Sequence, residues 1–232
     1  MAAQNLIILE DVSWSMEEFD GGVATRQDRV RNEMDHMLYE IKREVGDMEI
    51  DVYHGYFNCT VYPITGPYCF QTYTMDTVEK RPPKFGTALY RAIVQTMEFA
   101  VQLGGQKKIV ILTDGKDEDS EEFKEDAVHL LDKSFTSQHD IKVHLYGSTM
   151  AALRSNTAVF ADVSFYGEPV PRQEDQSNFD FEGEHMSQSS ISGSGDRCQE
   201  DSVDSFYTPP SQVGTLSQLS QGLAQDFMQY SC

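Results

Sequence analysis

The chain has 232 residues, 24% of them charged, and its 38 acidic and 18 basic residues give a formal net charge of −20. This length suits one medium globular domain with an additional segment. Nucleic acids and anionic membranes are bound through Lys and Arg that neutralise phosphates, so the acidic balance excludes both from the expected partners.

The first residues lack the basic region of a signal peptide, and no apolar run approaches the ~20 residues of a transmembrane helix. None of the four cysteines forms a C-x-x-C pair, which argues against a zinc site. Cys59 and Cys69 could pair across a loop, but free thiols in a reducing compartment are the preferred interpretation. We therefore expect a soluble, cytoplasmic protein.

The apolar pattern divides the first part of the chain into two strands and a helix. Residues 6–9 form a continuous apolar run, which is typical of a buried parallel strand. Apolar positions within 25–45 recur at helical spacing. Residues 48–57 alternate as in a strand, and we expect 60–64 to return as its hairpin partner. The prolines and glycines of 65–86 predict a loop.

The alternation of helices and strands continues to residue 166. We expect a helix at 88–103, a strand at 107–113, an acidic helix at 120–135 capped by Ser120, a strand at 141–146, a short helix at 150–154 and a strand at 159–165. This order predicts an α/β fold with a doubly wound, mostly parallel central sheet and helices on both faces. The strands at 6–9 and 107–113 should be central, and the hairpin should supply one short antiparallel edge strand.

Composition changes after Tyr166 and indicates three parts. Residues 1–166 carry the elements of the α/β domain. Residues 167–206 are acidic and rich in Ser, Gln and Gly, with few apolar residues to build a core, so we expect a disordered insertion or linker. Residues 207–232 end in an amphipathic helix that we expect to dock on the domain; binding of a partner is the alternative. Its apolar face comprises Leu216, Leu219, Leu223, Phe227 and Tyr230.

Oxygen-bearing side chains follow the two central strands. Asp11, Ser13 and Ser15 come directly after the first strand. Asp114 follows the second, and Thr87 stands at the start of a helix between them. Ligands of a doubly wound sheet bind outside the carboxyl ends of its strands, so these oxygens are expected to hold a hard cation there. The alternative is that the serines and Asp114 are turn residues and that Thr87 only caps its helix.

These three segments together resemble the von Willebrand factor type A (vWA) domain family, over about residues 4–166. The metal-ion-dependent adhesion site (MIDAS) of that family is written D-x-S-x-S, then a threonine, then an aspartate. Here "DVSWS" matches the first part, "GTAL" the second and "TDG" the third. The resemblance implies a Rossmann-like vWA fold and five metal-binding residues, which are Asp11, Ser13, Ser15, Thr87 and Asp114.

The function that the resemblance implies is that of a metal-dependent protein-binding module. The serines and the threonine supply neutral oxygens and the aspartates hold coordinating waters, so that Mg²⁺, or Mn²⁺ in its place, keeps an open position. An acidic side chain of a partner protein fills that position. Intracellular members of the family often serve as assembly or regulatory subunits, which allows an AAA+ ATPase or another assembly as the partner.

Three departures from the family pattern bear on the site. Trp14, the single tryptophan, stands between the serines and either packs under the loop or contacts a partner. Glu10 replaces the usual apolar residue, and it either adds negative charge beside the cation or is solvated. The acidic run at 117–119 is expected to be a solvated loop, although it could weaken the approach of an acidic ligand.

Two other functions remain open. One is a structural or assembly subunit whose metal only stabilises the fold. The other is a Mg²⁺-dependent hydrolase, which the residues disfavour. A haloacid-dehalogenase-type phosphatase needs a second acid where Ser13 stands, and neither G-x-S-x-G nor G-x-x-x-x-G-K-[ST] occurs. We therefore expect a binding module and not an enzyme.

Overall fold

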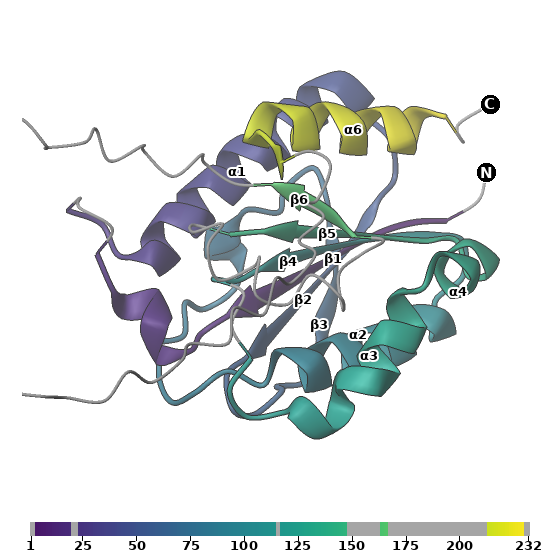
Figure 1. The fold of residues 1–232 in the computed structure, drawn as a ribbon. Coiled ribbons are helices and arrows are strands. Elements are labelled where there is room, and N and C mark those ends of the chain that lie inside the picture. The colour runs from purple at the N-terminus through teal and green to yellow at the C-terminus, as the bar shows by residue number, and fades with distance from the viewer. Residues whose placement is uncertain (1–2, 20–22, 115–116, 148–162, 167–212, 230–232) are drawn as a thin grey trace, which may run out of the picture. The chain divides into compact units, whose positions relative to one another are not determined.

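The centre of the fold is one sheet (Figure 1). In the computed structural model, which describes residues 3–19, 23–114, 117–147, 163–166 and 213–229, seven strands form it in the order β3-β2-β1-β4-β5-β6-β7. The strands are β1 (Gln4–Asp11), β2 (Asp51–Phe57), β3 (Thr65–Cys69), β4 (Gln106–Leu112), β5 (Ile141–Tyr146), β6 (Ser164–Tyr166) and β7 (Val213–Gly214). All neighbours are parallel except β2 and β3, which are antiparallel at one edge. This confirms the predicted doubly wound, mostly parallel sheet with one antiparallel edge strand.

Helices cover both faces of the sheet. They are α1 (Arg26–Val45), α2 (Leu89–Gln102), α3 (Lys124–Leu131), α4 (Lys133–Gln138) and α6 (Leu216–Met228). Figure 1 shows α1 and α6 together on one face and the other three on the opposite face. Successive side chains of β1 enter the two layers in turn: Leu6 and Ile8 pack under α1 and α6, whereas Ile7 packs under α2. A strand buried on both faces must be apolar throughout, and this accounts for the run at 6–9.

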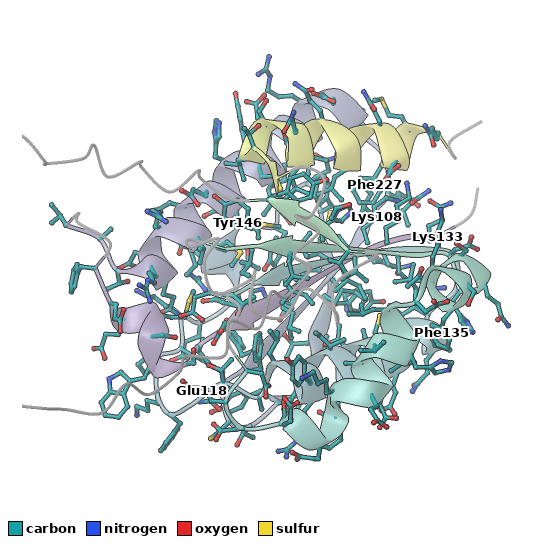
Figure 2. The ribbon with its side chains drawn as sticks, viewed as in Figure 1. Lys108, Glu118, Lys133, Phe135, Tyr146 and Phe227 are labelled. Atoms are coloured by element: carbon teal, nitrogen blue, oxygen red, sulfur yellow. The ribbon has the colours of Figure 1, made fainter. Side chains whose placement is uncertain are left out.

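The final helix, α6, joins the core that α1 covers. Thr215 begins it with a capping box, because its hydroxyl accepts from the Gln218 amide and the Gln218 side chain accepts from the Thr215 amide. Leu219, Leu223 and Phe227 are fully buried in that core. Figure 2 shows Phe227 beside Lys108 of β4, whose Nζ lies 4.2 Å from the ring centroid.

The hairpin partner of β2 was placed wrongly from the sequence, because it is β3 at 65–69 rather than 60–64. The Asn58 side chain accepts from the Thr60 amide at 2.8 Å, which forms a tight turn directly after β2. Val61 then makes one isolated bridge to Phe57, and Pro63 has no N–H to extend the ladder. Regular pairing begins only at Thr65, inside the segment predicted as loop.

The acidic helix expected at 120–135 is in fact three pieces: η3 (Glu121–Phe123), α3 and α4. Asp132 interrupts it, because its backbone is extended and its side chain accepts from the Ser134 amide at 2.8 Å to cap α4. Ser120 makes no side-chain cap on the helix that follows it. Its hydroxyl instead accepts from the Arg91 amide at 3.1 Å and donates to Asp117.

Several predictions fall outside the described residues. They are the short helix at 150–154, the start of the strand at 159–165, the acidic segment at 167–206 and the face position Tyr230. Of the four cysteines, Cys59 and Cys69 are described, and both are free thiols as expected. Within the described part of the chain, none of the helices combines the length and the apolar character that crossing a bilayer requires.

Candidate metal centre

The predicted site residues follow β1 and β4, at the centre of the sheet. The chain passes from β1 through α1 to β2 on one side, and β4 pairs with β1 on the other side. The strand order therefore reverses at the carboxyl end of β1, which is the switch point at which ligands of such sheets bind. Asp11 is the last residue of β1, and Asp114 comes two residues after the end of β4.

Asp11 is fully buried, and its carboxylate is held by neutral donors. Oδ1 accepts from the Ser13 amide at 2.8 Å, and Oδ2 accepts from the Thr113 hydroxyl at 2.7 Å. Burial, and after it the negative charge of Asp114, raises the pKa of Asp11 to about 7. The donors that meet Asp11 carry no charge, so they do not neutralise this carboxylate.

Ser13, Ser15 and Asp114 complete one side of the site. The two serine hydroxyl oxygens lie 3.1 Å apart, with Ser13 buried and Ser15 half-buried. Asp114 is buried as well, and within the described residues its Oδ1 has no hydrogen-bond partner. An unpaired carboxylate oxygen in a buried place is costly unless a cation or water meets it.

Thr87 is fixed between the loops that follow β1 and β4. Its carbonyl accepts from the amides of Glu118 and Asp119 at 2.8 and 3.1 Å. Gly86 packs so closely on Asp119 that an added Cβ would lie 2.0 Å from the carboxylate Oδ2. On the other side, the Lys84 amide donates to the Val12 carbonyl at 2.8 Å.

The hydroxyl of Thr87 is not used to cap α2. The N-cap of that helix is Ala88, which makes no side-chain cap. Asp117 meets the first amides instead, since its Oδ1 accepts from the Tyr90 amide at 3.2 Å. The alternative role of Thr87 as a helix cap is therefore wrong. Asp117 serves the fold rather than standing in a solvated loop, whereas Glu118 and Asp119 are exposed as expected.

Arg26, the first residue of α1, was missed from the sequence. Its Nη1 lies 2.9 Å from Glu18 Oε2, 3.2 Å from the Ser15 carbonyl and 3.5 Å from Asp114 Oδ2. A cation is unfavourable in the first turn of a helix, where the macrodipole is positive. This unfavourable placement is the signal in the sequence that could have indicated a nearby acid.

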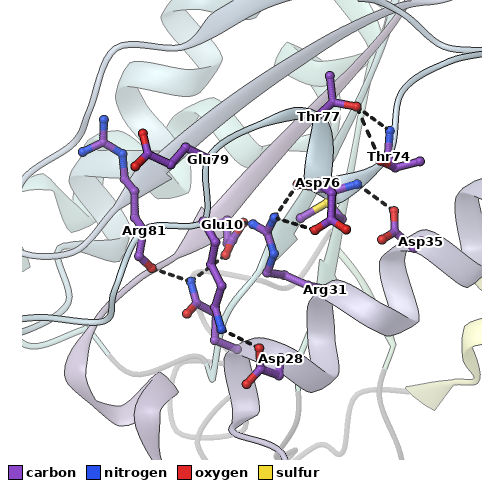
Figure 3. A network of polar contacts seen from close by, with 12 residues as sticks. Glu10, Asp28, Arg31, Asp35, Thr74, Asp76, Thr77, Glu79 and Arg81 are labelled. Carbon is purple, nitrogen blue, oxygen red and sulfur yellow. Dashed lines mark hydrogen bonds and ion pairs between the residues drawn. The ribbon is translucent and has the colours of Figure 1, made fainter.

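Glu10 does not face the candidate metal site and is not solvated, so both predictions for it are wrong. It points to the opposite face of β1 from Asp11 and is fully buried. Its carboxylate accepts from Gln27 Nε2 at 2.8 Å and from Arg31 Nη1 at 2.7 Å, and His54 Nε2 lies 3.3 Å away. Figure 3 shows Glu10 and Arg31 facing one another.

This buried ion cluster, defined as Glu10, Gln27, Arg31 and His54, ties α1 to the segment after β3. Arg31 also donates to the carbonyl of Met75 in η2 (Met75–Thr77), and Gln27 donates to the Arg81 carbonyl at 2.9 Å (Figure 3). Burial lowers the pKa of His54, which keeps this imidazole neutral beside the ion pair. The cluster holds the strand that ends in Asp11 in place.

Solved structures give the comparison for this fold. The chain is 12% identical to the VWA domain of SpRpn10, with a TM-score of 0.52 over 70% of this chain and 83% of that domain. The chain has the vWA fold. A PilB minor pilin from Streptococcus sanguinis is 16% identical, with a TM-score of 0.50 over 73% of this chain and 57% of the pilin, so the match spans less than two thirds of that protein. No protein-family model and no curated protein sequence matches the chain.

The residues present fit a hard cation within this vWA fold. Two carboxylates and three hydroxyls offer only oxygen, which is the donor set of Mg²⁺. Among the described residues Asp114 Oδ1 has no hydrogen-bond partner, and the pKa of Asp11 is raised although Arg26 lies near Asp114, so this one guanidinium, shared with Glu18, does not neutralise both carboxylates. Among the described residues, no group of three or more His, Cys, Asp or Glu side chains offers a competing metal site.

Proposed function

We propose that this chain is a metal-dependent protein-binding module, which presents a divalent cation to an acidic group of a partner protein. Asp11, Ser13, Ser15, Thr87 and Asp114 hold the cation. The vWA fold supports this proposal, because its switch point is where those residues lie. The proposal gives the metal no catalytic role, and Ser13 stands where a phosphatase of the class considered above needs a second acid.

The observation that carries the proposal is the buried pair of Asp11 and Asp114. Asp114 raises the pKa of Asp11, and two buried carboxylates that repel in this way are unfavourable in an empty site and favourable around a cation. Mg²⁺ suits the oxygen donors, and Mn²⁺ can replace it in an octahedral oxygen site. Because the direct protein ligands are three neutral hydroxyls and the two aspartates hold coordinating waters, the ligands at the metal do not neutralise it, and its open position attracts a carboxylate. An AAA+ ATPase or another assembly remains the expected kind of partner.

Calorimetric titration of Mg²⁺ and Mn²⁺ into the metal-free chain tests this function. We expect one saturable site in the wild type and none in the double variant Asp11→Asn with Asp114→Asn, which keeps the shape of both side chains. Asp132→Asn is the matched control, because that acid only caps α4. A chain that binds no metal contradicts the proposal. If metal binds and an immobilised acidic partner peptide is held equally well in EDTA, the metal serves only the fold.

A further inference from the structure

Exposed aromatic side chains gather on the loops that carry the candidate metal site. Four large aromatics are strongly exposed among the described residues: Trp14 (69%), Phe19 (60%), Tyr39 (59%) and Phe85 (60%). All except Tyr39 lie on the loop after β1 or on the loop that leads to Thr87. Trp14 therefore does not pack under its loop, and the aromatic surface belongs to the site's surroundings rather than being spread over the molecule.

Trp14 and Phe85 are joined through their backbones. The Trp14 amide donates to the Phe85 carbonyl at 2.9 Å, next to the bond from the Lys84 amide to the Val12 carbonyl. Phe85 also has φ of +66°, a conformation that is unfavourable for a bulky residue. Because the Phe85 ring is exposed, this strained conformation does not contribute to packing of the core. It indicates a contact made outside the chain.

The charges around Trp14 and Phe85 limit how many acidic side chains a bound partner segment can carry. The proposed cation and the exposed Lys84 favour one carboxylate at the centre. Exposed acids surround that centre, with Glu17 on one loop and Glu118 and Asp119 on another, in a chain of net charge −20. A run of acids would be repelled by these groups, whereas a single acid between apolar neighbours would not.

We propose that Trp14, Phe19 and Phe85 form an aromatic rim, and that this rim binds a partner segment in which one isolated carboxylate is flanked by apolar side chains. The inference rests on the proposed function, since the carboxylate completes the metal. A purely acidic segment would leave the rim in water, and a purely apolar segment would leave the cation's open position to water. Only a segment with both features uses both surfaces.

Selection from a random peptide library, displayed on phage and captured by the full chain in Mg²⁺, tests the rim. We expect recovered peptides to carry one Asp or Glu between apolar residues and to be released by EDTA. Affinities of the recovered peptides are then measured by fluorescence anisotropy. Trp14→Ser and Phe85→Asn should each weaken them at least tenfold; Asn is chosen because it tolerates a positive φ. Tyr39→Ser, which removes an equally exposed aromatic elsewhere, should leave them unchanged.

Mn²⁺ titration of each variant separates this inference from the function on which it rests. Recovered peptides with acidic runs, unaffected by the rim variants while Mn²⁺ still binds, would overturn the rim and leave the metal-dependent module standing. Absence of Mn²⁺ binding to the wild type would overturn both. Failure to recover any peptide also overturns the rim. If Trp14→Ser converts a dimer to a monomer in light scattering, the occupant is a second copy of this chain and the proposed partner chemistry is wrong.

Discussion

Glu10 and Asp11 are neighbouring buried acids on β1, but among the described residues only Glu10 is neutralised by a basic side chain. Glu10 is met by Arg31 and Gln27 at hydrogen-bond distance. Asp11 is met by neutral donors and by the repulsion of Asp114, whose nearby cation Arg26 is shared with Glu18. A buried acid that is neutralised within the chain belongs to the fold. A buried pair left without matching charge points to a cation from solution.

The largest expected effect is on stability and comes from removing the charge of Glu10, the neutralised acid. Glu10→Gln leaves the buried Arg31 guanidinium with only the exposed Asp76 carboxylate, 3.9 Å away, as a counter-charge in the described part of the chain. We therefore expect the free energy of unfolding to fall by about 3–5 kcal/mol in urea titrations. Adding Arg31→Met should restore part of this loss, because it removes the uncompensated charge. Glu40→Gln, which affects an exposed ion pair with Arg43, is the control and should change little. An equally small loss for Glu10→Gln would mean that the cluster is not what holds β1.

His144 is a buried base that, like Asp11, has no hydrogen bond to an opposite charge in the described part of the chain, and its effect on stability can be measured through pH. Both ring nitrogens of His144 on β5 lack hydrogen-bond partners within the described residues, and burial lowers its pKa to about 4. Asp226 of α6 faces it, as do Lys142 on its own strand, Lys108 of β4 and the Tyr166 ring of β6. Since the unfolded imidazole takes up its proton first, the contribution of His144 to stability is complete above pH 6.5 and is lost as pH falls toward 4.

The expected loss for His144 is about 3 kcal/mol across that range, from a lowering of the pKa by between two and three units. The measurement is the difference in unfolding free energy between wild type and His144→Phe at pH 7 and at pH 4, because this difference cancels the titration of every other group. A difference that stays constant with pH would show that His144 finds a partner when it is protonated.

The smallest effect probes the second sphere of the candidate metal site. Thr113→Val removes the hydroxyl that orients Asp11 Oδ2. We expect Mg²⁺ affinity to fall about tenfold, the lower end for loss of an outer-sphere hydrogen bond, with the fold retained. Calorimetry measures it against Thr96→Val, a buried threonine of α2 whose hydroxyl has no hydrogen-bond partner in the described residues. Equal affinity in both variants would remove Thr113 from the site.

The fold was predictable where local pattern and burial agree. The apolar strands and the spacing of α1, α2 and α6 follow from the sequence alone. The position of β3 was not predictable, because a local turn at Asn58 decides where pairing resumes. The break at Asp132 was missed for the same reason, since one side-chain cap overrides a continuous helical pattern.

The candidate site residues could be proposed from the sequence, but the buried side chains that hold their strand in place could not. The order of Asp11, Thr87 and Asp114 along the chain predicted that their three loops adjoin, and backbone hydrogen bonds join these loops. The burial of Glu10 was not visible, because on a strand buried on both faces nothing local distinguishes a paired acid from a solvated one. Its partner Arg31 lies on another element, 21 positions away. Long-range charge pairing of this kind requires the tertiary structure.

Because α6 packs against α1, the two faces of the sheet are expected to form at different times during folding. The helices α2, α3 and α4 that cover one face lie within residues 89–138, so short connections join them, although Ile7 of β1 packs beneath them. The face covered by α1 and α6 joins the beginning of the described chain to its end, which requires the closure of a very long loop. During synthesis, Leu6 and Ile8 therefore become fully buried only after Leu219 and Phe227 have been made, so this half of the core is completed last.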